Sequence, residues 1–210
     1  PTWTFGSGKF NSGNLGKPRV MTKKEARNLV NKYFINLSAK EKKNLDSRIL
    51  SNFIKFVDIS KYKKIGSYFS LHNEANTVYL NDYLTNAGIQ IFLPKVPKEK
   101  NNKKLNFFRY LKNDKFTKNR FGILEPSKNM NSSDINELDL IVVPFRAVNK
   151  NLYRLGYGGG FYDYSLSGIN SIKCLGIGYE FQILDEFNTE PHDFKLGRLI
   201  TPEGYFKNAL

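Results

Sequence analysis

The stretch Arg154-Leu155-Gly156-Tyr157-Gly158-Gly159-Gly160-Phe161-Tyr162-Asp163 follows the apolar run of residues 138–144 and leads into a segment that can start a helix. The apolar run predicts a strand buried on both faces, as parallel sheets require. Four glycines in five positions permit positive φ angles and a close approach of a ligand to the backbone. Successive backbone N–H groups in such a turn, with a helix N-terminus behind them, can bind an anion.

Two charged residues bracket this glycine stretch. Arg154 is a permanent cation that can grip a phosphate in two places. Asp163 is a carboxylate suited to Mg²⁺, which usually binds through one or two carboxylates and substrate phosphates. A tight strand-to-helix turn without a ligand is the alternative, because a glycine turn alone is a weak signal. The arginine, the aromatic residues and the aspartate together favour a nucleotide site.

Helix and strand patterns alternate along the rest of the chain. Helices are predicted over residues 22–36 and 38–56, each with a Ser or Thr N-cap and a glutamate three residues later, and over 76–87, where Gly88 follows the end. Strands are predicted over residues 65–70, 89–93 (stopped by Pro94), 105–111, 138–144, 171–179 and 199–201. Residues 114–137 are expected to be mostly loop, and 182–185 a helical turn. Such alternation predicts an α/β fold.

We therefore expect one three-layer α/β domain over residues 21–210, with a mixed, mostly parallel sheet flanked by helices. The ligand site of such a sheet lies beyond the C-terminal ends of its strands. Residues 1–20 are rich in Gly, Ser and Asn and lack an apolar period, so we expect a flexible leader, either a tag or a processed extension.

Composition limits the class of protein. The 210 residues are 40% hydrophobic and 14% aromatic, which is typical of a globular chain. The single cysteine, Cys174, excludes an intramolecular disulfide and suits a reducing compartment, and no apolar run approaches the ~20 residues of a membrane span. We therefore expect a cytoplasmic monomer without a membrane partner.

Positive charge is concentrated in the first part of the chain. The net charge is +14; residues 1–130 carry 26 Lys and Arg against 9 Asp and Glu, whereas residues 131–210 carry 7 against 10. A nucleic-acid-binding protein is one alternative that this charge raises, but the chain has no RNP-type, zinc-finger or helix-turn-helix signature. A kinase is another, but the Walker pattern is absent. Lysines on solvated faces, or steering of anionic small molecules, explain the charge without nucleic acid.

The motifs together resemble the 5-formyltetrahydrofolate cyclo-ligase family. The strongest match is Val143-Pro144 followed by the glycine stretch, in which every fixed position of the family's Arg-Leu-Gly-x-Gly-x-Gly-(Tyr/Phe)-Tyr-Asp block is present. Further matches are Lys23 and Arg27, Ser70 to Glu74, Leu93-Pro94-Lys95-Val96, Gly122-Ile123-Leu124-Glu125-Pro126 and Glu190-Pro191-His192-Asp193. The resemblance covers about residues 21–202.

This resemblance implies that ATP and Mg²⁺ drive the closure of 5-formyltetrahydrofolate to 5,10-methenyltetrahydrofolate through a phosphorylated formyl group. It assigns catalysis to Arg154 and Asp163, and the metal to Asp163 and Asp193. ATP would contact Lys23, Lys24, Arg27, Arg154, Leu155, Gly156, Tyr157, Gly158, Gly159, Gly160, Phe161 and Tyr162. The folate would contact Phe69, Glu74, Tyr157, Gly158, Gly159, Gly160 and Phe161.

Each of these residues also has a structural alternative. Lys23 and Arg27 can form a solvated helix face, Glu74 can be an acid favoured at a helix N-terminus, and Phe69 and Phe161 can be core residues. Residues 145–149 depart from the family, in which a small residue follows the proline. We nevertheless expect the first helix to bring Lys23 and Arg27 close to the glycine stretch.

Overall fold

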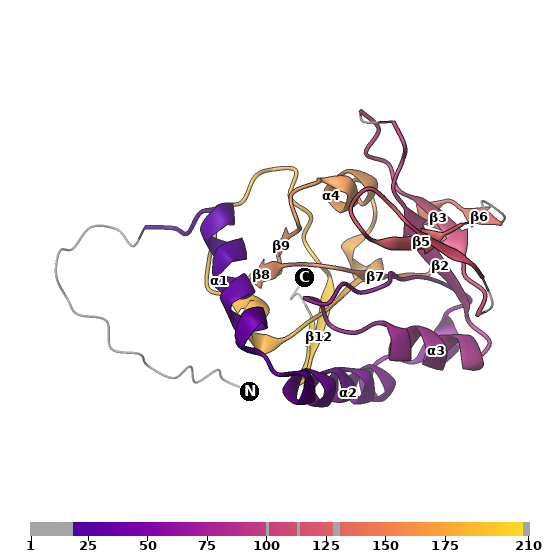
Figure 1. The fold of residues 1–210 in the computed structure, drawn as a ribbon, viewed down its shortest axis with the longest axis horizontal. Helices are drawn as coiled ribbons and strands as arrows, with labels where there is room; N and C mark the ends of the chain where they lie inside the picture. The colour runs from indigo at the N-terminus through magenta and orange to yellow at the C-terminus, as the bar shows by residue number, and fades with distance from the viewer. Residues whose placement is uncertain (1–18, 100, 113, 128–130, 208–210) are drawn as a thin grey trace.

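An eight-stranded sheet crosses the protein, and its five central strands run parallel (Figure 1). The computed structural model describes residues 19–99, 101–112, 114–127 and 131–207. In spatial order the strands are β13 (Gly204–Lys207), β12 (Arg198–Thr201), β10 (Cys174–Ile177), β7 (Leu140–Val143), β1 (Lys64–Gly66), β2 (Gln90–Lys95), β3 (Asn106–Arg109) and β6 (Ser132–Ser133). The edge strands β13, β3 and β6 pair antiparallel, so the sheet is mixed and mostly parallel, as predicted.

Helices cover both faces of this sheet. The helices are α1 (Lys23–Asn36), α2 (Ala39–Phe56), α3 (Val78–Asn86) and α4 (Phe161–Ser165). Figure 1 shows α2 and α3 along one face and α4 on the opposite side. Short 3-10 turns are η1 (Ile59–Lys61), η2 (Ile135–Glu137), η3 (Ser171–Lys173) and η4 (Glu180–Gln182). The three-layer α/β class is therefore confirmed.

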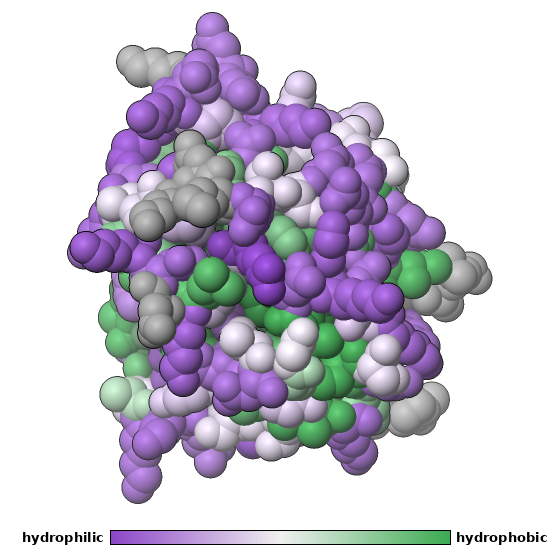
Figure 2. Space-filling view, turned by 90° about the vertical axis from the view of Figure 1, so that its right-hand side faces the viewer, coloured by the Kyte–Doolittle hydropathy of each residue, from purple (hydrophilic) through white to green (hydrophobic). Residues whose placement is uncertain are grey.

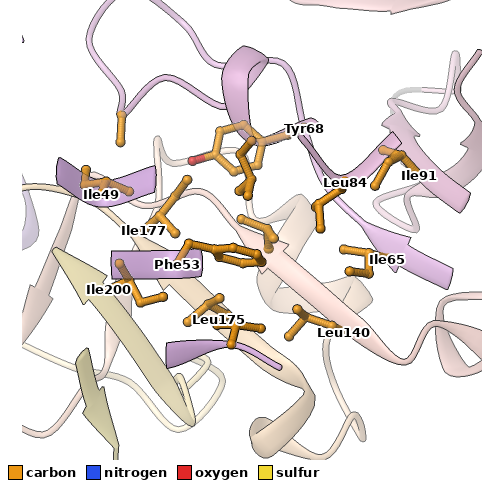
Figure 3. Packing of buried hydrophobic residues seen from close by; sticks show 14 of the residues in the cluster. Ile49, Phe53, Ile65, Tyr68, Leu84, Ile91, Leu140, Leu175, Ile177 and Ile200 are labelled. Atoms are coloured by element: carbon orange, nitrogen blue, oxygen red, sulfur yellow. The ribbon is translucent and has the colours of Figure 1, made fainter. Parts of the chain in front are cut away.

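Alternation along β7 explains the two halves of the core. Leu140 and Val142 face α2 and α3, and pack with Phe53 of α2 and other apolar side chains shown in Figure 3. Ile141 and Val143 point to the other face, into a cluster of strand and loop residues against which Phe161 and Tyr162 of α4 pack. A strand that is fully buried on both sides needs apolar residues throughout, which is why its sequence is a continuous hydrophobic run.

The two N-terminal helices begin where the sequence predicts. Thr22 caps α1 and Ser38 caps α2, and in both cases the glutamate three residues later completes a capping box. The capping boxes satisfy backbone N–H groups that a helix N-terminus otherwise leaves unpaired. Gly88 adopts a φ of 83° just after α3, as expected for a helix C-terminus.

Chain direction across the sheet reverses between β1 and β7. From β1 the chain proceeds to β2 and β3 on one side, whereas from β7 it proceeds to β10, β12 and β13 on the other. Loops that follow two such strands diverge and leave a crevice at the C-terminal edge of the sheet. The residues that follow β1 and β7 therefore start at the crevice, where we expect a ligand site.

Two small sheets flank the main one. The first joins β11 (Ile183–Leu184), β8 (Ala147–Asn149) and β9 (Arg154–Leu155), and α1 lies beside it (Figure 1). The second is a hairpin of β4 (Phe116–Lys118) and β5 (Leu124–Pro126). The described residues among 114–137 lie mostly outside strands, as predicted, although the hairpin and β6 lie within them. One prediction is corrected: residues 183–184 form a strand instead of a helical turn.

Pro94 does not end its strand, contrary to the prediction. The strand β2 continues through Lys95, and Pro94 lies opposite Phe107 of β3. Tyr110 donates to the carbonyl of Ile91, so the register turns the nitrogen of residue 94 away from β3. Pairing with β1 ends at Phe92, so the side that this nitrogen faces needs no donor.

Several other boundaries differ from the predictions. The first strand is limited to Lys64–Gly66, the third helix starts at Val78 after Thr77, and the segment from Ser171 begins as a 3-10 turn. Cys174 is fully buried in the core, as expected. The predicted leader, residues 1–20, lies outside the described residues except for Arg19 and Val20, so the domain boundary at residue 20 stays a prediction.

The surface agrees with a solvated role for most lysines. On the face drawn in Figure 2, hydrophilic residues cover most of the area, and hydrophobic residues form smaller patches near its centre and lower part. None of the helices in the described part of the chain is both long and apolar enough to cross a membrane.

Candidate active site

The glycine stretch connects β9 to α4 and takes backbone conformations that favour glycine. Gly158 has a φ of 105°, and Gly160, which caps α4, has a φ of 71°. A Cβ at Gly156 would lie 2.8 Å from Nη1 of Arg154, and one at Gly159 would lie 2.8 Å from the ring of Phe161. The glycines therefore allow both the turn itself and the packing of the two neighbouring side chains against it.

Arg154 points into the protein and pairs with Asp163. Its side chain is 3% exposed; Nη1 donates to the carbonyl of Pro144 at 3.0 Å, and Nη2 donates to Oδ1 of Asp163 at 2.7 Å. The guanidinium thus ties the end of β7 to the start of α4. The two residues that we predict to be catalytic therefore lie in direct contact.

Helix α1 places the two predicted cations in different surroundings. Arg27 donates from Nε to the carbonyl of Gly156 at 2.9 Å, and its guanidinium lies beside Gly158. Lys23 donates to Oδ1 of Asp193 at 2.8 Å and also to Glu190. The expected approach to the glycine stretch is therefore confirmed for Arg27, whereas Lys23 contacts the segment that contains Glu190 and Asp193. Lys24 is exposed, one position away from the face that Lys23 and Arg27 share.

The charges around α1 are balanced. Burial acts to lower the pKa of Lys23, but its hydrogen bonds with Asp193 and Glu190 raise that pKa overall. Burial lowers the pKa of Arg27, and the charges of Asp193 and Asp163 oppose that shift. Both carboxylates thus act electrostatically on the same guanidinium.

A mostly apolar cavity of about 380 Å³ lies at the crevice between β1 and β7. Its walls come from the loops after the strands, the glycine stretch and the β4–β5 hairpin. Lining residues include Tyr68, Phe69, Glu74, Phe121, Ile123, Pro144, Arg154, Gly156, Tyr157, Gly159, Gly160, Phe161, Tyr162 and Asp163. This position beyond the strand ends is the one expected from the sequence. A few polar groups in an apolar cavity are typical of small-molecule sites.

Glu74 is the buried acid of this cavity. It is 5% exposed, and it accepts a hydrogen bond from the backbone N–H of Leu71 at 2.7 Å. Burial raises the pKa of Glu74, and the Leu71 hydrogen bond and the charge of Arg146 oppose that shift only in part. A desolvated carboxylate of this kind gains strongly from a ligand that donates hydrogen bonds to it.

Phe69, which follows β1, and Phe161, at the start of α4, both line the cavity. Phe69 packs edge-on against Phe116 of β4, with ring centroids 4.8 Å apart. Phe161 packs edge-on against Phe121 of the hairpin loop at 5.8 Å. The β4–β5 hairpin therefore covers the cavity through aromatic contacts.

Two buried polar atoms of cavity-lining residues have no hydrogen-bond partner within the described residues. They are Nε of Arg154 and the hydroxyl of Tyr162. Buried polar groups in folded proteins are almost always paired with protein, water or a ligand. These two atoms are therefore consistent with a polar group bound close to the glycine stretch.

A second hollow lies beside α4, and its lining includes both predicted metal ligands, Asp163 and Asp193. Carboxylate oxygens are the ligands that Mg²⁺ prefers, so the chemistry of these two side chains fits that ion. The ligand atoms that lie within 4.8 Å of one another are those of Glu190, His192 and Asp193, and Asp163 is outside this group. Gly160 and Asp163 line both hollows, so the two hollows adjoin at the start of α4.

Sequence patterns did not identify several residues of this site. Arg146 is buried beside Tyr157, Glu190 binds Lys23, and Tyr68 and Phe121 line the cavity. Phe121 lies in a segment that we expected to be loop, although Gly122 after it, with a φ of 75°, is a hairpin-turn signal. Glu190 belongs to a matched motif, but its contact with Lys23 is 167 residues away in sequence, and Arg146 carries no local signal because its partners are also distant.

Comparison with known proteins identifies close relatives of one function. The sequence profile of the 5-formyltetrahydrofolate cyclo-ligase family matches residues 19–202. The 5-formyltetrahydrofolate cyclo-ligase of Haemophilus influenzae is 32% identical over 178 residues, which cover 83% of this chain and 94% of that protein. The protein of the same name from Escherichia coli K12 is 25% identical over 170 residues, covering 79% and 92%.

Solved structures give the same result. The 5,10-methenyltetrahydrofolate synthetase of Aquifex aeolicus superposes with a TM-score of 0.77 at 26% identity, covering 90% of this chain and 94% of that one. The synthetase of Mycoplasma pneumoniae superposes with a TM-score of 0.70 at 26% identity, covering 87% and 99%. Sequence and fold thus agree over nearly the full length of these relatives.

Proposed function

Because this chain belongs to the 5-formyltetrahydrofolate cyclo-ligase family, we propose that it uses ATP and Mg²⁺ to close 5-formyltetrahydrofolate into 5,10-methenyltetrahydrofolate, with release of ADP and phosphate. As a member of this family the protein is an enzyme. The observation that carries the proposal is that Gly160 and Asp163 line both a cavity that contains Glu74 and a hollow that contains Asp193. Two substrates bound at the glycine stretch would meet beside Asp163.

The proposed reaction has two steps. The formyl oxygen attacks the γ-phosphorus of ATP, and the bond between that phosphorus and ADP breaks. N10 of the folate then attacks the formyl carbon and loses its proton, and phosphate leaves with the original formyl oxygen. An amide oxygen is a poor leaving group until it carries phosphate, which explains the need for ATP. The protein mainly positions the reactants and neutralises charge.

The cavity would hold the folate, and α1 with the glycine stretch would hold ATP. In the cavity, Glu74 would accept hydrogen bonds from the ring N–H and amino groups of the pterin, with Phe69 and Phe161 flanking the folate. Lys23 and Arg27 of α1, which lie outside the lining of both hollows, would hold ATP phosphates. Release of Lys23 from Asp193 would free both groups for ligands. A contact between Lys24 and ATP stays a prediction.

The glycine stretch would contact both substrates through residues 155–162. Its backbone N–H groups and the N-terminus of α4 would face the phosphates, as anion-binding turns do. Arg154 would orient Asp163 and contribute positive potential from beneath the stretch. Asp163 and Asp193 would hold Mg²⁺, which neutralises phosphate charge when bound. The monomeric state and the cytoplasmic location also stay predictions.

The test is an absorbance assay at the band of the methenyl product. Purified protein is mixed with 5-formyltetrahydrofolate, Mg²⁺ and ATP, and Asp193→Ala and Glu74→Gln are measured in parallel. We expect a rise that needs both ATP and Mg²⁺ and that is lost in both variants. A folded wild-type protein that gives no rise would contradict the proposed function, and RNA binding would be the next measurement because of the basic surface.

A further inference from the structure

Arg146 contacts three parts of the proposed site: the turn next to Glu74, the glycine stretch and helix α1. It lies between β7 and β8, it is 4% exposed, and its backbone pairs with Leu155 of β9 through an N–H···O bond of 2.7 Å. None of the roles assigned above belongs to it. A buried guanidinium is costly unless several partners satisfy it, so the identity of its partners shows what it holds in place.

One partner is the turn that carries Glu74. Nη1 of Arg146 donates to the carbonyl oxygen of Asn73 at 3.0 Å. The hydroxyl of Tyr157 approaches the same carbonyl at 3.4 Å and Oδ1 of Asn73 at 3.3 Å. The residue next to Glu74 is thus bound both by Arg146 and by the glycine stretch.

The other partners of Arg146 are two aromatic rings and an asparagine. Its Cζ lies 5.1 Å from the ring centroid of Phe34 of α1 and 5.4 Å from that of Tyr157. Nη2 donates to Oδ1 of Asn31 of α1 at 3.1 Å. A planar cation with hydrogen bonds and ring contacts on several sides resists rotation, and lysine cannot reproduce this set of contacts.

We propose that Arg146 is a positioning residue for the folate half of the reaction, because it fixes the Asn73–Glu74 turn and the Tyr157 ring in the orientation that the pterin needs. This inference rests on the proposed function, in which Glu74 binds the pterin. Arg146 does not line the cavity itself, so it acts through Glu74 and Tyr157 and not by contact with substrate.

The nucleotide half has separate anchors. Lys23 is held by Asp193 and Glu190, and Arg27 is held by the carbonyl of Gly156. These contacts involve the first two turns of α1, whereas Arg146 contacts Asn31 and Phe34 further along the helix. Loss of Arg146 should therefore weaken folate binding and leave ATP binding nearly unchanged.

The experiment measures two dissociation constants for each variant, one for 5-formyltetrahydrofolate and one for ATP with Mg²⁺, by titration calorimetry on the full chain. For Arg146→Met we expect folate binding to weaken by about tenfold or more, as loss of a charged hydrogen-bond network does. The Kd for ATP should stay within about twofold of wild type, a difference that is small against typical interaction energies. The folate Kd of Arg146→Lys should lie between those of the wild type and Arg146→Met.

Two further variants guard against a loss of folding. Asn31→Ala removes one hydrogen-bond acceptor of the Arg146 guanidinium at an exposed helix position, so the variant should fold. It should also lose folate affinity while keeping ATP affinity, but by a smaller factor than Arg146→Met. Arg198→Met is the matched control, since Arg198 is a partly buried arginine of β12 that donates to the hydroxyl of Tyr62 at 3.0 Å. It should leave both dissociation constants unchanged.

A pH series separates a positioning role from a general loss of structure. Near Glu74 lie the charges of Arg146 and Lys42 and the hydroxyls of Tyr68, Tyr157 and Tyr162. Burial raises the pKa of each of these tyrosines, so they stay neutral during the assay. Without Arg146 the pKa of Glu74 should rise further, so folate binding by Arg146→Met should weaken more at pH 6 than at pH 8. Arg146→Lys keeps the charge and should lack this difference.

The outcomes are distinct. Selective loss of folate affinity, with ATP affinity retained, supports the role of Arg146. Unchanged folate affinity in a folded Arg146→Met protein, or equal losses for both ligands, would overturn it. Failure of the wild-type protein to bind 5-formyltetrahydrofolate would instead reject the proposed function. If Arg146→Met does not fold, Arg146→Lys and Asn31→Ala decide by the same criterion.

Discussion

The Arg154–Asp163 pair should contribute to stability as well as to activity, and the two contributions can be separated. Asp163→Asn removes the negative charge that lies 2.7 Å from a guanidinium with only 3% exposure. Removal of one partner from a fully buried pair costs about 3–5 kcal/mol. Asp163 is 17% exposed and asparagine keeps an oxygen acceptor, so we expect a loss of about 2–3 kcal/mol.

Urea unfolding followed by circular dichroism measures this loss. For a protein of this size the denaturant slope is about 2–3 kcal/mol per molar urea, so the midpoint should fall by about 1 M. Adding Arg154→Met removes the unpaired cation and should recover at least about 1 kcal/mol, which appears as a coupling energy in the double-mutant cycle. Neither protein should turn over substrate, because the proposed metal ligand is lost in both.

An unfolding midpoint of Asp163→Asn within about 0.2 M urea of wild type would refute the reasoning, because the denaturant slope converts it to a negligible loss of stability. The carbonyl of Pro144 would then be sufficient to satisfy the buried guanidinium. Recovery of activity in the double variant would contradict the proposed metal role of Asp163 while leaving the stability argument intact.

Four further outcomes are expected. Gly197→Ala should lower stability by about 1–3 kcal/mol in thermal melts, since a Cβ there would lie 2.2 Å from the carbonyl oxygen of Ser171, and backbone cannot move aside easily; an unchanged Tm would contradict this. Arg27→Met should raise the KM for ATP by about tenfold with little change in kcat, because it removes a cation beside the glycine stretch; an effect on the folate KM alone would exclude this role. Burial raises the pKa of Glu74 in the folded protein, so the folded state loses stability as pH rises from the unfolded pKa through the folded pKa. Glu74→Gln should therefore become more stable relative to wild type as pH rises from 4 to 8, and it should lose folate affinity. Denaturant midpoints of the variant and the wild type that change with pH by the same amount would contradict this. Burial raises the pKa of the Cys174 thiol to about 12, so native protein at pH 8 should resist alkylation that is rapid in urea, and fast labelling of folded protein would show that the core opens.

Local signals predicted the elements that depend on local chemistry. Thr22 with Glu25, and Ser38 with Glu41, are complete capping boxes within four residues, so the sequence shows both helix starts. The strand β7 is identifiable because burial on both faces demands an unbroken apolar run. The glycine stretch was found because its backbone conformation restricts the residue type.

The remainder depends on contacts between distant residues. Strands of two or three residues, such as β11, are too short to show a period and exist because a neighbouring strand pairs with them. The inward direction of Arg154 depends on the carbonyl of Pro144, which only the folded chain supplies. Arg146 is a charged residue in a buried position, and its partners on α1 and near Glu74 are 115 and 73 residues away.

Assembly of the α1 contacts depends on the order of synthesis. Lys23 is one of the first residues of the described chain, yet its partners Glu190 and Asp193 follow it by 167 and 170 residues. At about 5–20 residues per second, α1 would wait roughly ten to thirty seconds on the ribosome before these partners are made. A chain that terminates before Glu190 could form much of the sheet but not this anchor. The proposed ATP contact of Lys23 would therefore mature later in synthesis than that of Arg27, whose partner Gly156 is made before Glu190.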